Sequence, residues 1–269
     1  MTQSQANLIT VRQPVFEFPA PIDRYWMGGS VFKTHLLNTF TLMLPEMERY
    51  LIQVVNQGLK QAKTPECQEQ GRSFIGQEAQ HAKQHIRLWE ALRQQGYQID
   101  SYLESVRFFF FKVLMLRCST PVNLAIGAAG EHLTTLVAAI VLEENFLADA
   151  EPSLKDLFEW HAAEEIEHRS VVYNVLHSVT DRYPIRILGL LLSHGLVLGL
   201  LFFGLLMLLY QDKKLLDRQV WREMMQFWFT KEKVFFKLIR NAVQYTQPNF
   251  HPSQQHQFLD ESAILQRLA

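Results

Sequence analysis

Two stretches decide the fold: FIGQEAQHAKQH at residues 74–85 and WHAAEEIEHRSVVYNV at residues 160–175. The first contains Glu78 and His81. The second contains Glu165 and His168 at the same Glu-x-x-His spacing. On an α-helix, residues three positions apart lie within about 60° of each other, so each pair directs a carboxylate and an imidazole toward one point. Each stretch therefore predicts a helix that carries half of a metal site.

Helical periodicity covers most of the chain. Prolines divide it into segments of helical length, apolar residues recur every three or four positions within them, and few segments alternate with period two. Helices are predicted at residues 31–43, 45–61, 66–95, 101–117, 121–148, 153–180, 185–211 and 217–244. The boundary at Pro45 follows from its missing N–H, which costs nothing in the first turn of a helix. We expect a nearly all-α protein.

A dimetal site inside a helix bundle takes one Glu from each of two helices and a Glu-x-x-His pair from each of two others. The segment LPEMERYLI at 44–52 offers Glu46 and Glu48. These two residues lie about 200° apart on a helix and cannot both face inward. Apolar residues share the side of Glu48, whereas Arg49 and Lys60 share the side of Glu46. Glu48 is the predicted inward carboxylate.

The other single Glu is Glu131, the only acidic residue in PVNLAIGAAGEHLTTLVAAIVL at 121–142. A lone buried carboxylate costs several kcal/mol unless it is neutralised, paired with a cation or bound to metal. No Lys or Arg occurs between Arg117 and Lys155, so no local cation is available. Glu131 is therefore predicted to bind metal.

The predicted ligands and catalytic residues are Glu48, Glu78, His81, Glu131, Glu165 and His168. The order Glu, then Glu-x-x-His occurs twice, with the two Glu 30 positions apart in one case and 34 in the other, which resembles a duplicated helix pair. Solvated Glu-rich helix faces are the alternative. His85 and His161 lie on the same helix faces as the predicted ligands. Either could be a third nitrogen donor, or could form a hydrogen bond to a ligand. Glu164 and His132 are offset from the ligands, and Glu167 is expected to be solvated.

The motifs LPEMERYLI, FIGQEAQHAKQH, GEHLT and WHAAEEIEHRSVVYNV resemble those of the bacterial family of predicted metal-dependent hydrolases, itself similar to the ferritin-like di-iron carboxylate superfamily. The resemblance covers about residues 14–245. It implies a ferritin-like four-helix bundle with a dimetal core site, followed by additional helices. In that family the first motif usually has Gly before the ligand Glu, and Met47 stands there in this chain.

Glu and His ligands without Cys suit iron, manganese or zinc, and the resemblance favours two iron ions. Two such ions permit either oxygen activation, which needs an external electron donor, or hydrolysis by a bridging hydroxide. No Ser/His/Asp arrangement is visible, and the ligand set is similar to that of oxygen-activating bundles. We therefore expect an oxygenase or oxidase, with a metal-dependent hydrolase as the alternative and a non-catalytic metal-storage bundle as a second alternative.

The expected substrate is hydrophobic and lipid-like, because the chain contains unusually apolar segments. Phe108 to Phe111 form a run between Arg107 and Lys112, as in a segment that lies at a membrane interface. Lys and Arg (26) nearly balance Asp and Glu (27), so the composition gives no support for nucleic-acid binding. The two cysteines are far apart and lack metal-site spacing, which fits a reducing, cytoplasmic location.

The longest apolar segment is 187–210, with 24 residues and no charged side chain. It is long enough to cross a bilayer core of roughly 30 Å. Arg182 and Arg186 precede it and further basic residues follow it, so the positive-inside bias gives no clear orientation. Alternatives are a helix that dips into one leaflet and a buried helix at a homodimer interface, where Gly195 and Gly199 permit close packing. Membrane association from the cytoplasmic side is expected.

The chain is predicted to have four parts. They are an irregular N-terminal arm at 1–30, the metal-binding bundle at 31–182, the apolar helix with an amphipathic helix at 183–247, and a tail at 248–269. The arm lacks the basic start and apolar run of a secretory signal, and the tail lacks periodicity.

Overall fold

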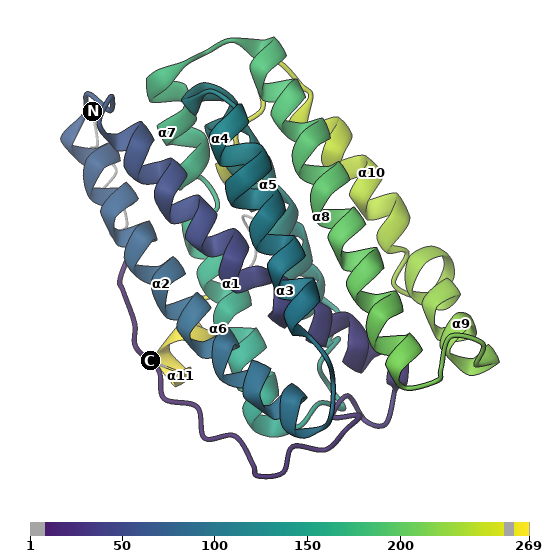
Figure 1. Ribbon diagram of the computed structural model, residues 1–269. Coiled ribbons are helices and arrows are strands. Elements are labelled where there is room, and N and C mark those ends of the chain that lie inside the picture. Colours follow the sequence, from purple (N-terminus) through teal and green to yellow (C-terminus); the bar gives the residue numbers. More distant parts are fainter. Residues whose placement is uncertain (1–8, 256–260, 269) are drawn as a thin grey trace.

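The computed structural model describes residues 9–255 and 261–268, so parts of the predicted arm (1–8) and tail (256–260 and 269) lie outside the described residues. Figure 1 shows long helices lying side by side. The α-helices, long and short, are α1 (Val31–Leu59), α2 (Pro65–Gln94), α3 (Asp100–Arg107), α4 (Met115–Arg117), α5 (Thr120–Glu143), α6 (Pro152–His168), α7 (Val171–Val179), α8 (Tyr183–Gln211), α9 (Arg218–Met225), α10 (Val234–Tyr245) and α11 (Ser262–Leu268). Within the described residues there is no strand, which confirms the all-α prediction.

Helix α1 is continuous, so the predicted boundary at Pro45 is wrong. Pro45 lies inside the helix and cannot donate a hydrogen bond to the carbonyl of Thr41 four residues earlier. The indole Nε1 of Trp89 on α2 donates to that carbonyl instead, at 2.9 Å. A contact from a neighbouring helix thus replaces the bond that proline removes, and the helix continues.

Other predicted helices are interrupted or shorter in the structure. The helix predicted at 121–148 ends at Glu143, because Asn145 adopts a left-handed conformation with φ of 49°. The helix predicted at 153–180 divides into α6 and α7 directly after His168, where no helix breaker marks the sequence. The segments predicted at 101–117 and 217–244 each contain a π-helical stretch, at Phe108–Leu114 and Gln226–Thr230.

Two helices, α5 and α8, are long and apolar enough to cross a membrane by length and composition, but their burial differs. The most apolar stretch of α5 is 94% buried, so α5 is a central core helix. The corresponding stretch of α8 is 39% buried. Helix α8 approaches α5 closely at Gly189, where a Cβ would lie 2.4 Å from the backbone of Ala125. Apart from the adjacent residues and backbone of α8 itself, nothing in the described chain lies within 4 Å of a Cβ placed at Gly195 or Gly199.

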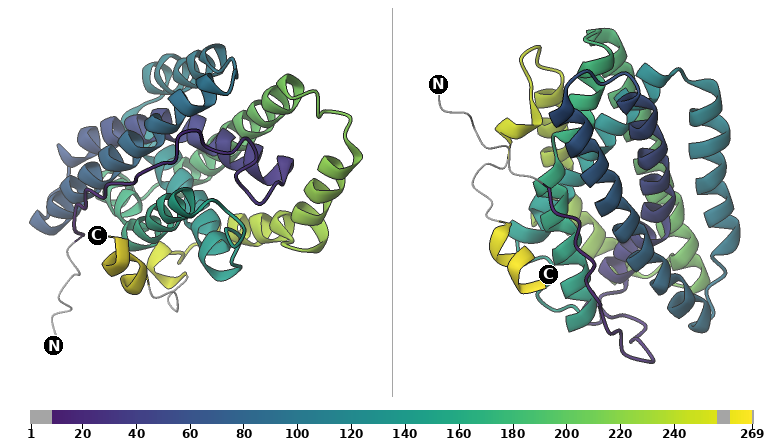
Figure 2. Two further views of the ribbon diagram at one scale, coloured as in Figure 1. Left: turned by 90° about the horizontal axis from the view of Figure 1, so that it is seen from below. Right: turned by 90° about the vertical axis from the view of Figure 1, so that its left-hand side faces the viewer.

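The segment after α8 returns to the same bundle. His132 Nε2 on α5 lies 3.0 Å from the carbonyl of Asn241 on α10, and Lys237 forms an ion pair with Glu144. Helices α8, α9 and α10 therefore lie together on the side of the molecule away from α2 (Figures 1 and 2). A single crossing by α8 that separates α10 from the bundle does not fit this arrangement.

The described part of the N-terminal arm runs along the outside of the helices, as Figure 2 shows. The side chains of Gln84 and Arg87 on α2 donate to the carbonyls of Pro14 and Phe16. These bonds hold the arm against α2 and bring its residues near the predicted metal ligands.

Candidate metal centre

The six predicted ligands come together in the bundle interior. They come from α1 (Glu48), α2 (Glu78 and His81), α5 (Glu131) and α6 (Glu165 and His168), and each is at most 3% exposed. The helix geometry behind the Glu-x-x-His spacing places both members of each pair on the buried face. Nε2 of His168 lies 3.3 Å from an oxygen of Glu131 and 3.4 Å from an oxygen of Glu78, although these residues come from three different helices.

The donor atoms form three overlapping groups that could each hold a metal ion, with all atoms of a group within 4.8 Å of one another. The groups are Glu48, His81 and His161; Glu78, His81 and Glu165; and Glu78, Glu131 and His168. The first and third groups share no residue, and the second group contains members of both neighbourhoods. The arrangement therefore has two separate ends, which the second group joins through His81 and Glu78.

Glu78 and Glu165 occupy the middle of the cluster. Oε1 of Glu78 lies 3.7 Å from Nδ1 of His81 and 3.4 Å from Nε2 of His168. Oε1 of Glu165 lies 3.8 Å and 3.5 Å from the same two nitrogens. Both carboxylates thus stand between the two imidazoles.

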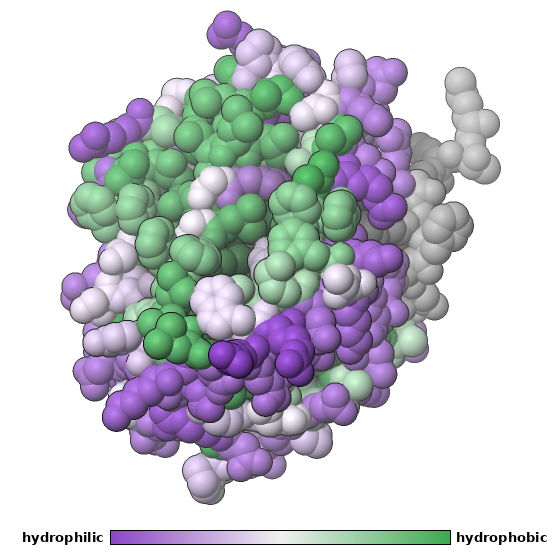
Figure 3. Space-filling model, turned by 90° about the vertical axis from the view of Figure 1, so that its right-hand side faces the viewer, coloured by the Kyte–Doolittle hydropathy of each residue, from purple (hydrophilic) through white to green (hydrophobic). Residues whose placement is uncertain are grey.

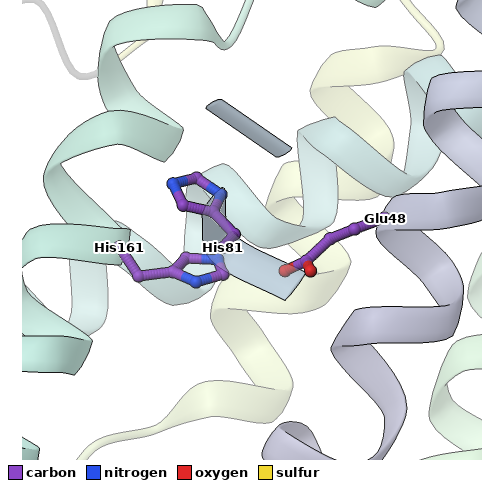
Figure 4. Close-up of side chains that lie close together, drawn as sticks. All are labelled: Glu48, His81 and His161. Atoms are coloured by element: carbon purple, nitrogen blue, oxygen red, sulfur yellow. The ribbon is translucent and has the colours of Figure 1, made fainter. Parts of the chain in front are cut away.

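The structure separates the positions of the two additional histidines. Figure 4 shows the ring of His161 beside that of His81, with the carboxylate of Glu48 pointing toward them, and the two ring centroids are 4.1 Å apart. His85 lies behind His161, with Nε2 2.9 Å from Nδ1 of His161 and Nδ1 3.2 Å from the hydroxyl of Thr41. Among the described residues, His161 belongs to a three-donor group and His85 to none.

Hydrogen bonds from outside the cluster set which nitrogen of His81 and of His168 faces inward. Nε2 of His81 lies 2.9 Å from Oε2 of Glu164, which leaves Nδ1 directed at the centre. Nδ1 of His168 lies 3.1 Å from Oε1 of Gln77, which leaves Nε2 directed at the centre. Thr134 donates to Glu165. Contacts of this kind fix the orientation of metal-binding imidazoles and carboxylates.

Arg12 of the N-terminal arm contacts the residues that surround the cluster. Its guanidinium donates to Glu164 at 3.0 Å and to Glu167 at 2.8 Å, and Gln77 also donates to Glu167 at 2.7 Å. The expectation that Glu167 is solvated is therefore wrong, because its side chain is only 18% exposed and is paired. Nothing in the sequence near the motifs indicates Arg12, since the contact joins residues 152 and 155 positions apart.

Glu46, which is predicted not to share the inward side of Glu48, is also buried. Its side chain is 2% exposed and accepts hydrogen bonds from Arg49 and from Arg107, each at 2.8 Å. The helical angle correctly separates Glu46 from Glu48, but neighbouring Arg107 covers the Glu46 side. Glu46 is thus a buried carboxylate with cationic partners, outside the metal cluster.

The centre contains buried carboxylates to which the described chain donates no hydrogen bond. Within the described chain, both carboxylate oxygens of Glu48 and of Glu131 are buried without a hydrogen-bond partner. Burial and then the charge of Glu78 raise the pKa of Glu48 well above its usual value, and burial and then the charge of Glu165 do the same for Glu131. Leaving such groups unpaired costs several kcal/mol, and a bound cation removes that cost. The donor set therefore fits a metal.

Glu165 shows the opposite electrostatic state. Burial opposes its ionisation, but His168 and His161 outweigh that effect and hold its pKa well below the usual value. Burial, followed by the neighbouring charge of His81, lowers the pKa of His161. The centre thus combines an ionised carboxylate with a neutral imidazole at its His161 end.

The family model described as "Predicted metal-dependent hydrolase" matches residues 10–256. The chain belongs to this family. Membership corrects the expected function: the family description supports the hydrolase alternative and overturns the prediction of an oxygen-activating oxidoreductase. That prediction depended on the ligand set, and carboxylate and imidazole donors serve both kinds of chemistry. No curated protein and no solved structure matches the chain.

Proposed function

We propose that the protein is a metal-dependent hydrolase whose centre binds two metal ions in a ferritin-like arrangement of α1, α2, α5 and α6. One observation supports this most strongly: seven buried nitrogen and oxygen atoms without a hydrogen-bond partner meet in one cluster of the described chain. They are both carboxylate oxygens of Glu48 and Glu131, Oε1 of Glu78, Nδ1 of His81 and Nε2 of His168. A structural role alone gives no reason to bury so many unpaired donors together.

The two ends of the cluster suggest how the ions divide the ligands. Glu48 and His81, with His161, would hold one ion, and Glu131 with His168 would hold the other. Glu78 and Glu165 lie between the imidazoles and would serve both. Iron, manganese and zinc all suit these ligands, and iron is the first to test.

The bound metal would supply a water molecule of lowered pKa and would polarise the bond to be cleaved. Glu165 and His161 are the two ionisable ligand-cluster residues that also line a small cavity of about 40 Å³ beside the centre. The contact with His85 would hold His161 there as a metal ligand, and Thr134 donates a hydrogen bond to Glu165. Gln77 and Glu164 keep the two ligand imidazoles oriented.

Metal reconstitution tests the proposal. Protein freed of metal with a chelator is loaded with iron under anaerobic conditions, or with manganese or zinc. Hydrolysis of a panel of esters and phosphoesters is then assayed, and bound metal is measured. We expect hydrolysis to appear with the metal and to reach its maximum near two ions per chain. Glu48→Ala should lower both metal content and hydrolysis, whereas Glu46→Ala, two residues away on α1, should change neither. Hydrolysis that persists without metal, or full metal loading without hydrolysis of any substrate, would contradict the proposal.

A further inference from the structure

A large apolar cavity of about 280 Å³ lies between α1, α5, α8 and the α9–α10 segment. Among the described residues that line it, only Thr134 and the indole of Trp228 carry a side-chain nitrogen or oxygen. An apolar cavity of about 150 Å³ already remains dry and binds small hydrocarbons. This cavity therefore suits a hydrocarbon group and offers almost nothing to a sugar, nucleotide or peptide, whose polar groups would be buried unpaired.

The apolar cavity adjoins the candidate metal centre. Phe40, Thr134 and Val137 line both this cavity and the small cavity that contains His161 and Glu165. Thr134 also donates a hydrogen bond to Glu165. A ligand that extends through both spaces would have its polar end at the centre and its apolar end between α5 and α8.

The opposite end of the cavity reaches the surface between α8 and α10. Phe202 lines the cavity and is 52% exposed. Figure 3 shows apolar side chains gathered around a recess on this face, above a hydrophilic band. The large exposed apolar residues between positions 202 and 239 include Phe202, Phe203, Trp221, Phe229, Phe235, Phe236 and Ile239.

Basic residues accompany these exposed apolar residues. Between residues 211 and 245 there are eight Lys or Arg and four Asp or Glu, although the whole chain has a net charge of −1. Lys231, Lys233 and Arg240 are exposed on the same segment as the aromatic residues. Aromatic and basic side chains together on one exposed face are typical of helices that lie on anionic bilayers.

We propose that this cavity holds the hydrocarbon chain of a membrane lipid ester, which enters from an anionic bilayer through the α8–α10 face and places its ester at Glu165. The proposal rests on the proposed hydrolase function. It names the substrate class of that site and the surface from which the substrate comes. A second copy of this chain would also cover apolar residues, but it gives no role to a cavity that leads to the centre.

Lipid quenching of tryptophan fluorescence tests chain entry without any hydrolysis. Metal-free protein is mixed with anionic vesicles whose acyl chains carry bromine, which quenches nearby indoles. We expect strong quenching, of which Trp228→Phe removes at least half, because Trp228 lines the cavity. Trp221→Phe is the matched control on α9, outside the cavity lining, and should remove less. Quenching that is absent, equal with zwitterionic vesicles, or unaffected by Trp228→Phe overturns the proposal.

Filling the cavity gives a second measurement. Leu198 lines the cavity, and Leu191 lies on the exposed side of the same helix, 66% exposed. Leu198→Trp should weaken binding of a long-chain fatty acid in equilibrium dialysis at least tenfold and lower long-chain relative to short-chain ester hydrolysis. Leu191→Trp should do neither. Unchanged fatty-acid binding in a folded Leu198→Trp variant overturns the cavity assignment.

The two proposals fail in different ways. Short-chain ester hydrolysis without fatty-acid binding or vesicle quenching leaves the hydrolase function and overturns the lipid assignment. Quenching and fatty-acid binding without metal-dependent hydrolysis of any ester overturns the hydrolase function, and with it the assignment of a lipid ester as substrate. A dimer that forms without vesicles and blocks quenching identifies a second copy as the occupant of this face and overturns the bilayer route.

Discussion

Buried carboxylates at two places in the molecule have opposite surroundings. At the C-terminal end of α8, the Asp212 side chain is 1% exposed and accepts hydrogen bonds from Tyr25, His35 and Tyr97 at 3.0, 2.8 and 2.8 Å, and also from Arg24. In the centre of the bundle, within the described chain, the oxygens of Glu48 and Glu131 have no hydrogen-bonding partner. The same chemical group is fully hydrogen-bonded at one site and lacks hydrogen bonds at the other.

Their pKa values shift in opposite directions for this reason. Burial disfavours ionised Asp212, but bonds from His35, Arg24 and Tyr97 outweigh it and hold the pKa of Asp212 well below its usual value. At Glu131, burial and neighbouring carboxylates act together and raise the pKa. Asp212 therefore stabilises the fold by joining the arm, α1, the α2–α3 connection and α8. Glu131 destabilises the metal-free protein and is suited to a cation.

The largest expected effect is the loss of metal on substitution at the unpaired site. Glu131→Ala should reduce bound metal to one ion or none, because its carboxylate contributes to one end of the cluster. Hydrolysis should fall by more than the roughly 10- to 100-fold that loss of an outer hydrogen-bonding partner costs. Elemental analysis, ester assays and circular dichroism, which should show intact helices, measure this. A variant that retains two ions would show that Glu131 is not a ligand.

The next effect concerns the paired site. Asp212→Asn should lower the free energy of unfolding by about 3 kcal/mol, because it leaves Arg24 and His35 without their anionic partner. Metal content should not change. Urea denaturation measures the difference, and Asp181→Asn, whose side chain is 82% exposed, is the control and should change little. An equal loss of unfolding free energy in both variants would contradict the structural role of Asp212.

A smaller, pH-dependent effect separates the two sites by sign. The raised pKa of Glu131 means that metal-free wild-type protein regains stability as the pH falls toward about 4.3, the unfolded value. Glu131→Gln does not titrate and should be about 1–2 kcal/mol more stable than wild type at pH 8. That advantage should shrink on acidification.

Asp212 behaves in the opposite sense. Its lowered pKa makes its contribution fully present above about pH 4 and lost as the pH falls through the folded value. Denaturation of the metal-free variants between pH 8 and 4 measures the Glu131 trend, and denaturation of the Asp212→Asn variant and wild type below pH 4 measures the Asp212 trend. A Glu131→Gln advantage that grows toward acidic pH would contradict the assigned shift.

The smallest effect is expected at Glu46, which is buried like Glu48 but paired like Asp212. Its partners Arg49 and Arg107 are 44% and 55% exposed and become hydrated when Glu46 is removed. Glu46→Ala should therefore cost about 1 kcal/mol or less and leave metal binding unchanged. Thermal unfolding with metal analysis measures this, and a loss of metal equal to that in Glu48→Ala would place Glu46 in the centre.

The cavity and the outer hydrogen bonds lay beyond prediction from the sequence. A cavity between α1, α5, α8 and α10 depends on how these helices pack, which the apolar pattern of each helix does not determine. Arg12 and Gln77 likewise have no local signal that connects them to α6, because their partners Glu164 and Glu167 lie far away in the chain.

Local helical geometry by itself determined the all-α class and the inward pairs Glu78 with His81 and Glu165 with His168, because spacing along one helix sets which side chains share a face. The sequence also identified Glu131 as a candidate metal ligand, because no Lys or Arg lies nearby in the chain. Tertiary structure alone decided that α1 continues through Pro45, that Glu46 is paired with Arg107, and that His81 directs Nδ1 inward. Each depends on a hydrogen bond from another helix, and such bonds exist only after the helices have packed.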